Sequence, residues 1–260
     1  MKPLKIAALL CAFIVPLTGM SAAGAATYPV LASELIANPL YESGRLAQTA
    51  CDEKPIKRNN RKLARAYFDG VIACLESTWE KHLTDAGLSY TKLRVRHVAK
   101  IPKKYCGYTS SKGDSEALYC EGNRTVLVEL GKDWLNDVSD LWLFHQASFT
   151  YAEHVQNLAG ISAAYEELPY DKRAELLEQS RRLSLQTDCL STVFLQSVWP
   201  LKGRTTKDWN YLLSLQEGDL RGEERWWGKS SSVRYWMKQG FATSDPASCN
   251  TWTASSSKVA

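Results

Sequence analysis

The residues of this chain that could do acid–base or metal chemistry gather in two stretches. The first is "FTYAEHVQNLAG" (149–160), which holds Glu153 and His154, and the second is "RLSLQTDCLST" (182–192), which holds Asp188. Two carboxyl groups and an imidazole could transfer protons or bind a metal weakly. Zinc sites use three or four protein ligands. We therefore favour the simpler alternative, in which Glu153 is solvated or hydrogen-bonded and His154 caps or packs.

Other combinations of reactive side chains fit known catalytic patterns poorly. Thr150 and Ser184 carry hydroxyl groups, but no histidine is placed to activate either one as a nucleophile. His145 and His154 are nine residues apart, which places them near opposite faces of one helix. The chain has no C-x-x-C pair, which disfavours a zinc finger.

The stretches that hold these side chains are predicted to be helical. Apolar residues recur in them at three- and four-residue steps, as they do in several other long stretches. A break is expected near Ser139. In the last stretch Ser232 is a candidate cap and Gly240 lies close to the predicted end. The predicted helices span residues 60–87, 133–160, 169–199, 205–218 and 230–243.

The predicted strands lie in the N-terminal half of the chain. Residues 88–100 alternate between apolar and polar side chains, and residues 117–130 have the pattern of a hairpin that follows a polar loop at 102–117. The predicted fold is therefore α+β and mainly helical, with a small β-hairpin or sheet packed on a helical bundle. A single domain at 27–252 is large enough to bury one core.

Both ends of the chain are expected to lie outside this domain. Residues 1–26 have the parts of a secretory signal peptide: an early positive charge, an apolar run at 6–17 and the small residues Ala23-Gly24-Ala25. The alternative is an uncleaved N-terminal anchor, which would be the chain's one contact with a membrane. Residues 253–260 are expected to form a flexible tail. The protein is thus expected to be secreted, extracellular or in the periplasm or cell envelope.

Charge and cysteine content narrow the class of protein. The signal peptide holds two of the 32 basic residues, which leaves 30 against 28 acidic ones. This balance gives no electrostatic argument for binding nucleic acid. Six cysteines remain after Cys11, and an even count in an exported chain predicts three disulfides with 15 alternative pairings.

Four stretches resemble, in the same order, the motifs of a known family. They are "YCEGNRTVLVEL" (119–130), "SFTYAEHVQNLAG" (148–160), "RLSLQTDCLST" (182–192) and "SSSVRYWMKQGFATSDPASCNTW" (230–252). The chain resembles the neutral zinc metallopeptidase family of bacterial secreted and membrane-anchored proteins. The match spans 104–252 and is weaker over 27–100. The resemblance implies a zincin-like metallopeptidase-type fold and, where the motifs are complete, zinc-dependent peptide hydrolysis.

This chain departs from the family at the positions that carry the chemistry. The resemblance places the first zinc histidine on Phe149, the general-base glutamate on Thr150 and the second zinc histidine on Glu153. The third ligand, a glutamate, falls on Ser184, and the aspartate that orients a ligand is retained as Asp188. The resemblance therefore implies no catalytic residue and no zinc site, and we expect no cofactor.

The family frame also implies how the cysteines pair and where a binding surface could lie. The implied disulfides are Cys51–Cys74, Cys106–Cys120 and Cys189–Cys249. The numerous tryptophans either pack in the core or, in "ERWWGK" (224–229), line an exposed groove. An exposed apolar groove would suggest a partner.

Three functions are consistent with these observations. The first is an exported, catalytically inactive relative, a pseudopeptidase, that binds a peptide, a partner protein or a cell-envelope component. The second is an active zinc-dependent peptidase with an atypical site, which would require zinc. The third is a structural protein of the cell envelope. Whether Phe149 plugs the former cleft distinguishes the first from the third.

Overall fold

The computed structural model describes residues 30–110, 113–136 and 141–260. The predicted signal peptide and the break expected near Ser139 lie outside the described residues. The fold is α+β and mainly helical, as predicted. The helices are α1 (Ser33–Ile36), α2 (Arg61–Asp85), α3 (Lys132–Leu135), α4 (Trp142–Leu158), α5 (Ile161–Glu166), α6 (Arg173–Ser197), α7 (Thr206–Ser214) and α8 (Ser230–Thr243). The strands are β1 (Arg94–Val98), β2 (Lys104–Tyr105), β3 (Tyr108–Thr109), β4 (Glu116–Cys120) and β5 (Thr125–Glu129).

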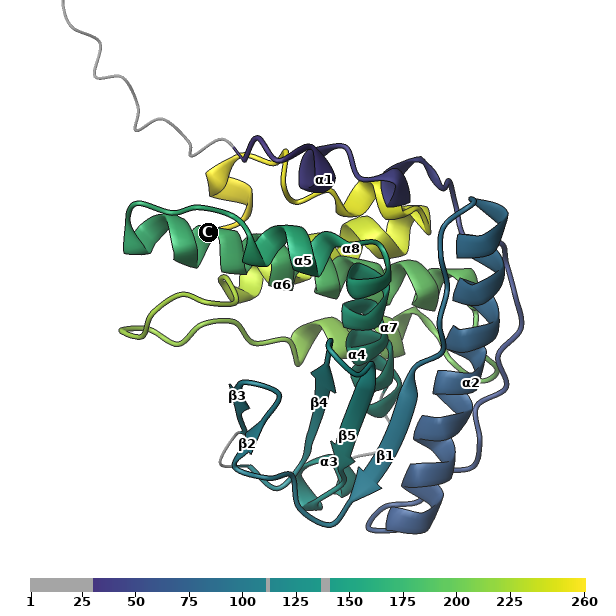
Figure 1. Ribbon diagram of the computed structural model, residues 1–260. Coiled ribbons are helices and arrows are strands. Elements are labelled where there is room, and N and C mark those ends of the chain that lie inside the picture. The colour runs from purple at the N-terminus through teal and green to yellow at the C-terminus, as the bar shows by residue number, and fades with distance from the viewer. Residues whose placement is uncertain (1–29, 111–112, 137–140) are drawn as a thin grey trace, which may run out of the picture.

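Three helices form the centre of the helical layer. α6 packs against both α4 and α8, and α2 packs against α4 at the edge of the molecule (Figure 1). α8 continues past Gly240 to Thr243, because this glycine lies against α6 rather than ending the helix. A Cβ atom at Gly240 would lie 2.1 Å from the carbonyl oxygen of Cys189, so a larger residue would force the two helices apart.

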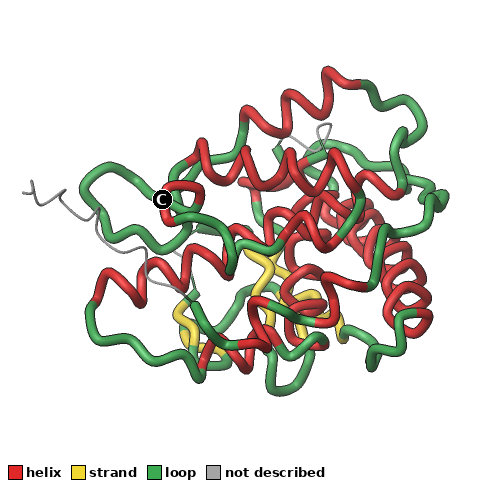
Figure 2. Tube along the Cα trace, turned by 90° about the horizontal axis from the view of Figure 1, so that it is seen from above, coloured by secondary structure: helices red, strands yellow, loops and turns green. Residues whose placement is uncertain are grey.

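The strands form a small layer of their own. β5 lies in the middle of a three-stranded sheet, parallel to β1 and antiparallel to β4, which confirms the predicted hairpin. Every residue of β5 is buried. Figure 1 shows the sheet below α5, α6 and α8, and helices cover much of it in the view of Figure 2. β4 packs against α4, so the sheet and the helical layer meet at the helix that carries Glu153.

Two short elements were missed by the sequence patterns. β2 and β3 form a two-stranded sheet within the predicted loop, where Cys106 and Gly107 have φ values of 52° and 83° and make the turn. α5 follows α4 after Gly160, whose φ of 75° ends α4 and redirects the chain. Both elements are too short to show a periodic pattern of apolar residues.

Three disulfides join the pairs that the family frame implied. They link Cys51 to Cys74, Cys106 to Cys120 and Cys189 to Cys249. Structural disulfides are typical of proteins that fold outside the reducing cytoplasm. Within the described residues, none of the helices combines the length and apolar content that crossing a membrane requires.

The expectation of a flexible C-terminal tail was wrong. Val259 is fully buried, and the indole of Trp236 donates a hydrogen bond of 3.0 Å to the carbonyl of Lys258. Ser232 was also predicted wrongly, because α8 starts at Ser230 and the Ser232 hydroxyl instead donates to the carbonyl of Ala260 at 2.6 Å. The last residues pack through the side chain of Val259 and through backbone carbonyl groups. The polar composition of the tail therefore gives no sign of this packing.

Candidate functional site

The residues at the family's catalytic positions lie on two helices that pack against each other. Phe149 and Glu153 are one helical turn apart on α4, and Ser184 and Asp188 are one turn apart on α6. Trp227, in the loop between α7 and α8, lies beside both pairs. Figure 1 shows this loop extending past α6 away from α2.

Phe149 stands between two small cavities. The Asp188 cavity, of about 180 Å³, is lined by His145, Phe149, Ser184, Asp188, Glu217 and Trp227, among others. The Glu153 cavity, of about 160 Å³, is lined by Tyr108, Glu121, Phe149, Glu153, Tyr165 and Trp227, among others. The phenyl ring therefore lines both cavities and fills neither.

The three residues expected to form a residual polar site are not brought together. Glu153 and Asp188 line different cavities, and His154 lines neither. The His154 ring is fully buried, with Nδ1 2.9 Å from the hydroxyl of Tyr119 and Nε2 2.7 Å from the carbonyl oxygen of Thr91. Burial lowers the pKa of His154 to about 4, so a neutral ring accepts from the tyrosine and donates to the carbonyl. His154 therefore joins α4 to the sheet, which is a packing role.

Burial perturbs the ionisation of the groups that face the cavities. It raises the pKa of Glu153 to about 8, and the nearby carboxylate of Glu121 raises it further. Burial also raises the pKa of Asp188 well above its usual range. His145 has a pKa lowered to about 4 by burial, and neither of its ring nitrogens has a hydrogen-bond partner among the described residues. Three titratable groups thus line the cavities, buried or half-buried, without a compensating charge among the described lining residues.

The residues present do not fit the zinc site of the family. Phe149 has no lone pair, and the hydroxyl of Thr150 donates to the carbonyl of Gln146 on its own helix at 3.0 Å. Over the part of the chain that the structure describes, no three or more His, Cys, Asp and Glu residues are arranged to hold a metal ion. Glu153 could donate to a metal, but its cavity supplies too few further ligands for zinc.

Two glutamines retained from the motifs have a structural role that the sequence did not reveal. The amide of Gln156 on α4 donates to the side-chain oxygen of Gln186 on α6 at 2.9 Å. Thr187 donates to Gln156 at 2.8 Å, and Gln186 donates to the hydroxyl of Tyr41 at 2.7 Å. This buried network joins the two helices on which the site is built.

Trp227 is exposed and lines both cavities, as one of the two alternatives for this stretch predicted. Its side chain is 59 % exposed, whereas Trp134, Trp236 and Trp252 are buried in the core. Asp219 accepts hydrogen bonds from the backbone amides of Trp226, Trp227 and Gly228 at 3.0, 2.9 and 2.6 Å. The loop that presents the indole is therefore held in place by a carboxylate that no sequence motif singled out.

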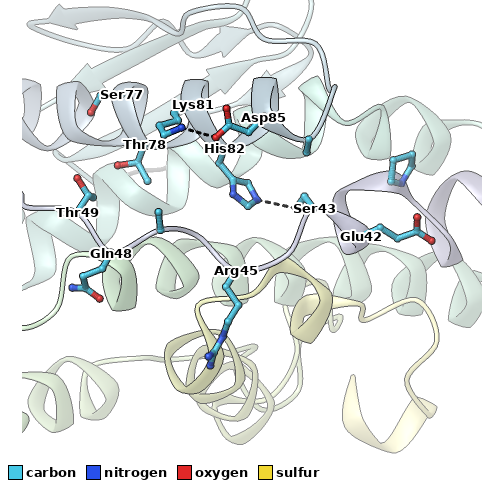
Figure 3. A pocket seen from close by; sticks show the side chains of 13 residues that line it. Glu42, Ser43, Arg45, Gln48, Thr49, Ser77, Thr78, Lys81, His82 and Asp85 are labelled. Atoms are coloured by element: carbon cyan, nitrogen blue, oxygen red, sulfur yellow. Dashed lines mark hydrogen bonds and ion pairs between the residues drawn. The ribbon is translucent and has the colours of Figure 1, made fainter.

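A larger cavity than these two lies elsewhere. A cavity of about 790 Å³ lies between α2 and residues 39–49. The ring of His82 extends across it, with Nε2 2.8 Å from the hydroxyl oxygen of Ser43 (Figure 3). Lys81 and Asp85 pair with each other along its wall. None of the family's catalytic positions lines this cavity, so its size does not make it the candidate site.

Comparisons with known proteins agree with the motifs. The sequence profile of a family described as "Putative neutral zinc metallopeptidase" matches residues 22–220. The uncharacterized protein YpfJ of Escherichia coli (strain K12) is 27 % identical in an alignment 211 residues long that covers 74 % of this chain and 73 % of that protein. YpfJ of Escherichia coli O6:H1 gives the same values. No solved structure matches the chain significantly.

Proposed function

The chain belongs to the neutral zinc metallopeptidase family, and from this premise we propose that it is a metal-free member that acts by binding. It would be an exported pseudopeptidase whose ligand is a peptide, a partner protein or a component of the cell envelope. The observation that carries this proposal is the phenyl ring of Phe149, which lies between two cavities at the position of the first zinc histidine. Export is supported by three disulfides.

The loss of hydrolysis follows from the chemistry of the replaced residues. Hydrolysis by this family uses a metal-bound water and a glutamate that accepts its proton. Thr150 stands at the glutamate position, and its hydroxyl is bound to a backbone carbonyl. Removing a general base alone lowers a rate by a factor of about 10²–10⁴. Losing the metal ligands at the same site removes the nucleophile as well.

A binding role is favoured over a purely structural one. A structural protein has no need for polar groups that are buried without partners, because each costs about 1–3 kcal/mol of stability. Among the described residues neither nitrogen of His145 has a partner, and the ring lines a cavity of about 180 Å³. Trp227 also remains exposed where the cavities meet, rather than closing over them.

Metal content tests the proposal. Residues 27–260 are produced with disulfides intact and dialysed against sub-stoichiometric zinc, and bound zinc is determined by mass spectrometry. We expect no bound zinc and no cleavage of peptide substrates. A matched control carries Phe149→His, Thr150→Glu, Glu153→His and Ser184→Glu, which together restore the family's residues. This control is expected to retain zinc. Close to one tightly held zinc in the natural chain would overturn the proposal.

A further inference from the structure

We propose that the Asp188 and Glu153 cavities bind primary ammonium groups, so that the ligand of this protein is a lysine-containing peptide or a polyamine. The inference rests on the proposed binding function and specifies its chemistry. It is drawn from the charges, the unpaired groups and the aromatic walls of the two cavities.

The acidic side chains of both cavities have no cationic partner in the described lining, and a bound ammonium group would favour their ionised forms. Asp188 and Glu217 line the first cavity, and Glu121 and Glu153 line the second. Among the residues that the structure describes, no lysine or arginine lines either cavity. The lining therefore offers acceptors for hydrogen bonds and no positive charge to neutralise them. An ammonium group has three donors, no acceptor and the complementary charge.

Unpaired buried groups point independently to an occupant of the Asp188 cavity. The Asp188 side chain is 6 % exposed, and its carboxyl group accepts no hydrogen bond from the residues that the structure describes. His145 is 4 % exposed and lines the same cavity with both ring nitrogens unpaired. Native proteins pair nearly all such groups with protein, water or ligand. An ammonium group can donate hydrogen bonds both to the carboxyl oxygens of Asp188 and to the neutral imidazole of His145.

Aromatic rings complete the site. Phe149 and Trp227 form a wall common to both cavities, and Tyr108 and Tyr165 line the Glu153 cavity. Aromatic faces attract ammonium groups, and tryptophan does so most strongly. The hydrogen bonds from the Trp227 loop to Asp219 hold this wall in place before a ligand arrives.

Because Phe149 and Trp227 line both cavities, the two cavities adjoin, and this favours a ligand with more than one amine. Each cavity is small, at about 160–180 Å³, and admits the end of an alkylammonium chain. A diamine, or two lysine side chains of one peptide, could place one ammonium group on each side of the shared wall. Occupying both cavities from one molecule raises affinity through effective concentration.

Calorimetric titration of the disulfide-intact chain tests the inference with three probes. They are 1,5-diaminopentane, a trilysine peptide with blocked ends, and the same peptide with its three side chains acetylated. We expect one or both amine probes to bind and the acetylated peptide to bind at least tenfold more weakly. Stronger binding of trilysine identifies a peptide as the natural source, and stronger binding of the diamine identifies a polyamine.

Variants locate the binding. Asp188→Asn is expected to weaken amine binding at least tenfold, while Glu223→Gln, an exposed acid of the neighbouring loop that lines neither cavity, leaves it unchanged. If Asp188→Asn fails to fold, Trp227→Ala replaces it, because this exposed side chain can be removed without disturbing the core. Weakening by these variants supports the site.

Three outcomes overturn the inference: no binding of either amine probe, equal binding of the acetylated peptide, or equal weakening by Glu223→Gln. The zinc content of the same preparation separates this failure from that of the proposed function. A zinc-free chain that binds no amine refutes the ammonium site alone. A zinc-bound chain refutes the pseudopeptidase proposal on which the inference rests.

Discussion

Replacing Glu153 by glutamine should stabilise the protein, and by more as the pH rises. The carboxyl group has an ordinary pKa of 4.5, which burial and the charge of Glu121 raise to about 8 in the folded chain. Between these two pH values the folded state binds a proton that the unfolded state has lost. The free energy of unfolding therefore falls as the pH rises through this interval. Glutamine keeps the shape of the protonated acid and never carries the charge.

The size of the effect follows from the interval between the two pKa values. Each pH unit contributes about 1.4 kcal/mol, so the penalty reaches about 3 kcal/mol at pH 7 and about 5 kcal/mol at pH 9. Glu153 is only half-buried, and water in its cavity screens the charge. We therefore expect Glu153→Gln to be more stable by about 2–4 kcal/mol at pH 9 and by close to zero at pH 4.5.

Urea denaturation at pH 4.5, 7 and 9 measures this difference for the natural chain and for Glu153→Gln. Glu223→Gln serves as the control, because that carboxyl group is exposed and its substitution should give a difference that stays near zero. A stability difference that does not grow with pH would refute the reasoning. It would mean that the Glu153 cavity solvates a carboxylate as well as bulk water does.

Three further predictions concern the scaffold and can be tested by denaturant titration. Gln186→Ala should destabilise the fold by about 1–3 kcal/mol, because it removes one of the two acceptors of the buried Gln156 amide and leaves only the carbonyl of Leu183; an effect below 0.5 kcal/mol would show that water replaces the lost acceptor. Val259→Ala should cost about 1–2 kcal/mol if the last residues are packed, and nothing if they are loose. Replacing both Cys189 and Cys249 by serine should cost about 2–4 kcal/mol, and an unchanged midpoint would show that the bridge adds little to the packing of α6 against the segment that follows α8.

The helical elements could be predicted because each has a long amphipathic pattern. In α2 the residues Tyr67, Val71, Leu75 and Trp79 recur at helical spacing, and all four are buried. The hairpin of β4 and β5 was equally clear, since two apolar runs flank a polar turn. Short elements such as β2, β3 and α5 depend on single residues with a left-handed backbone conformation. A periodic pattern of apolar side chains gives no sign of such residues.

The sequence predicted residue by residue that the family's zinc ligands are absent, but it could not predict the shape of the two cavities. Phe149 could be expected to fill space, whereas its position between two cavities depends on how α4 packs against α6. Glu121 and Tyr108 join the site from the sheet side of the molecule and precede the α4 residues of the site by about 30 to 40 positions in the sequence. Asp219 acts through backbone amides, which carry no sequence signal. Contacts of this kind arise only from tertiary structure.

The hydrogen bond between Gln156 and Gln186 bears on how a function is assigned to a protein from its sequence similarity to another protein. Both glutamines belong to the motifs by which this chain resembles peptidases, and both join helices rather than take part in chemistry. A similarity score built on such positions measures shared architecture and is insensitive to whether a metal could lie between the helices. Within this family, competence for hydrolysis should be judged from the positions equivalent to 149, 150, 153 and 184 alone.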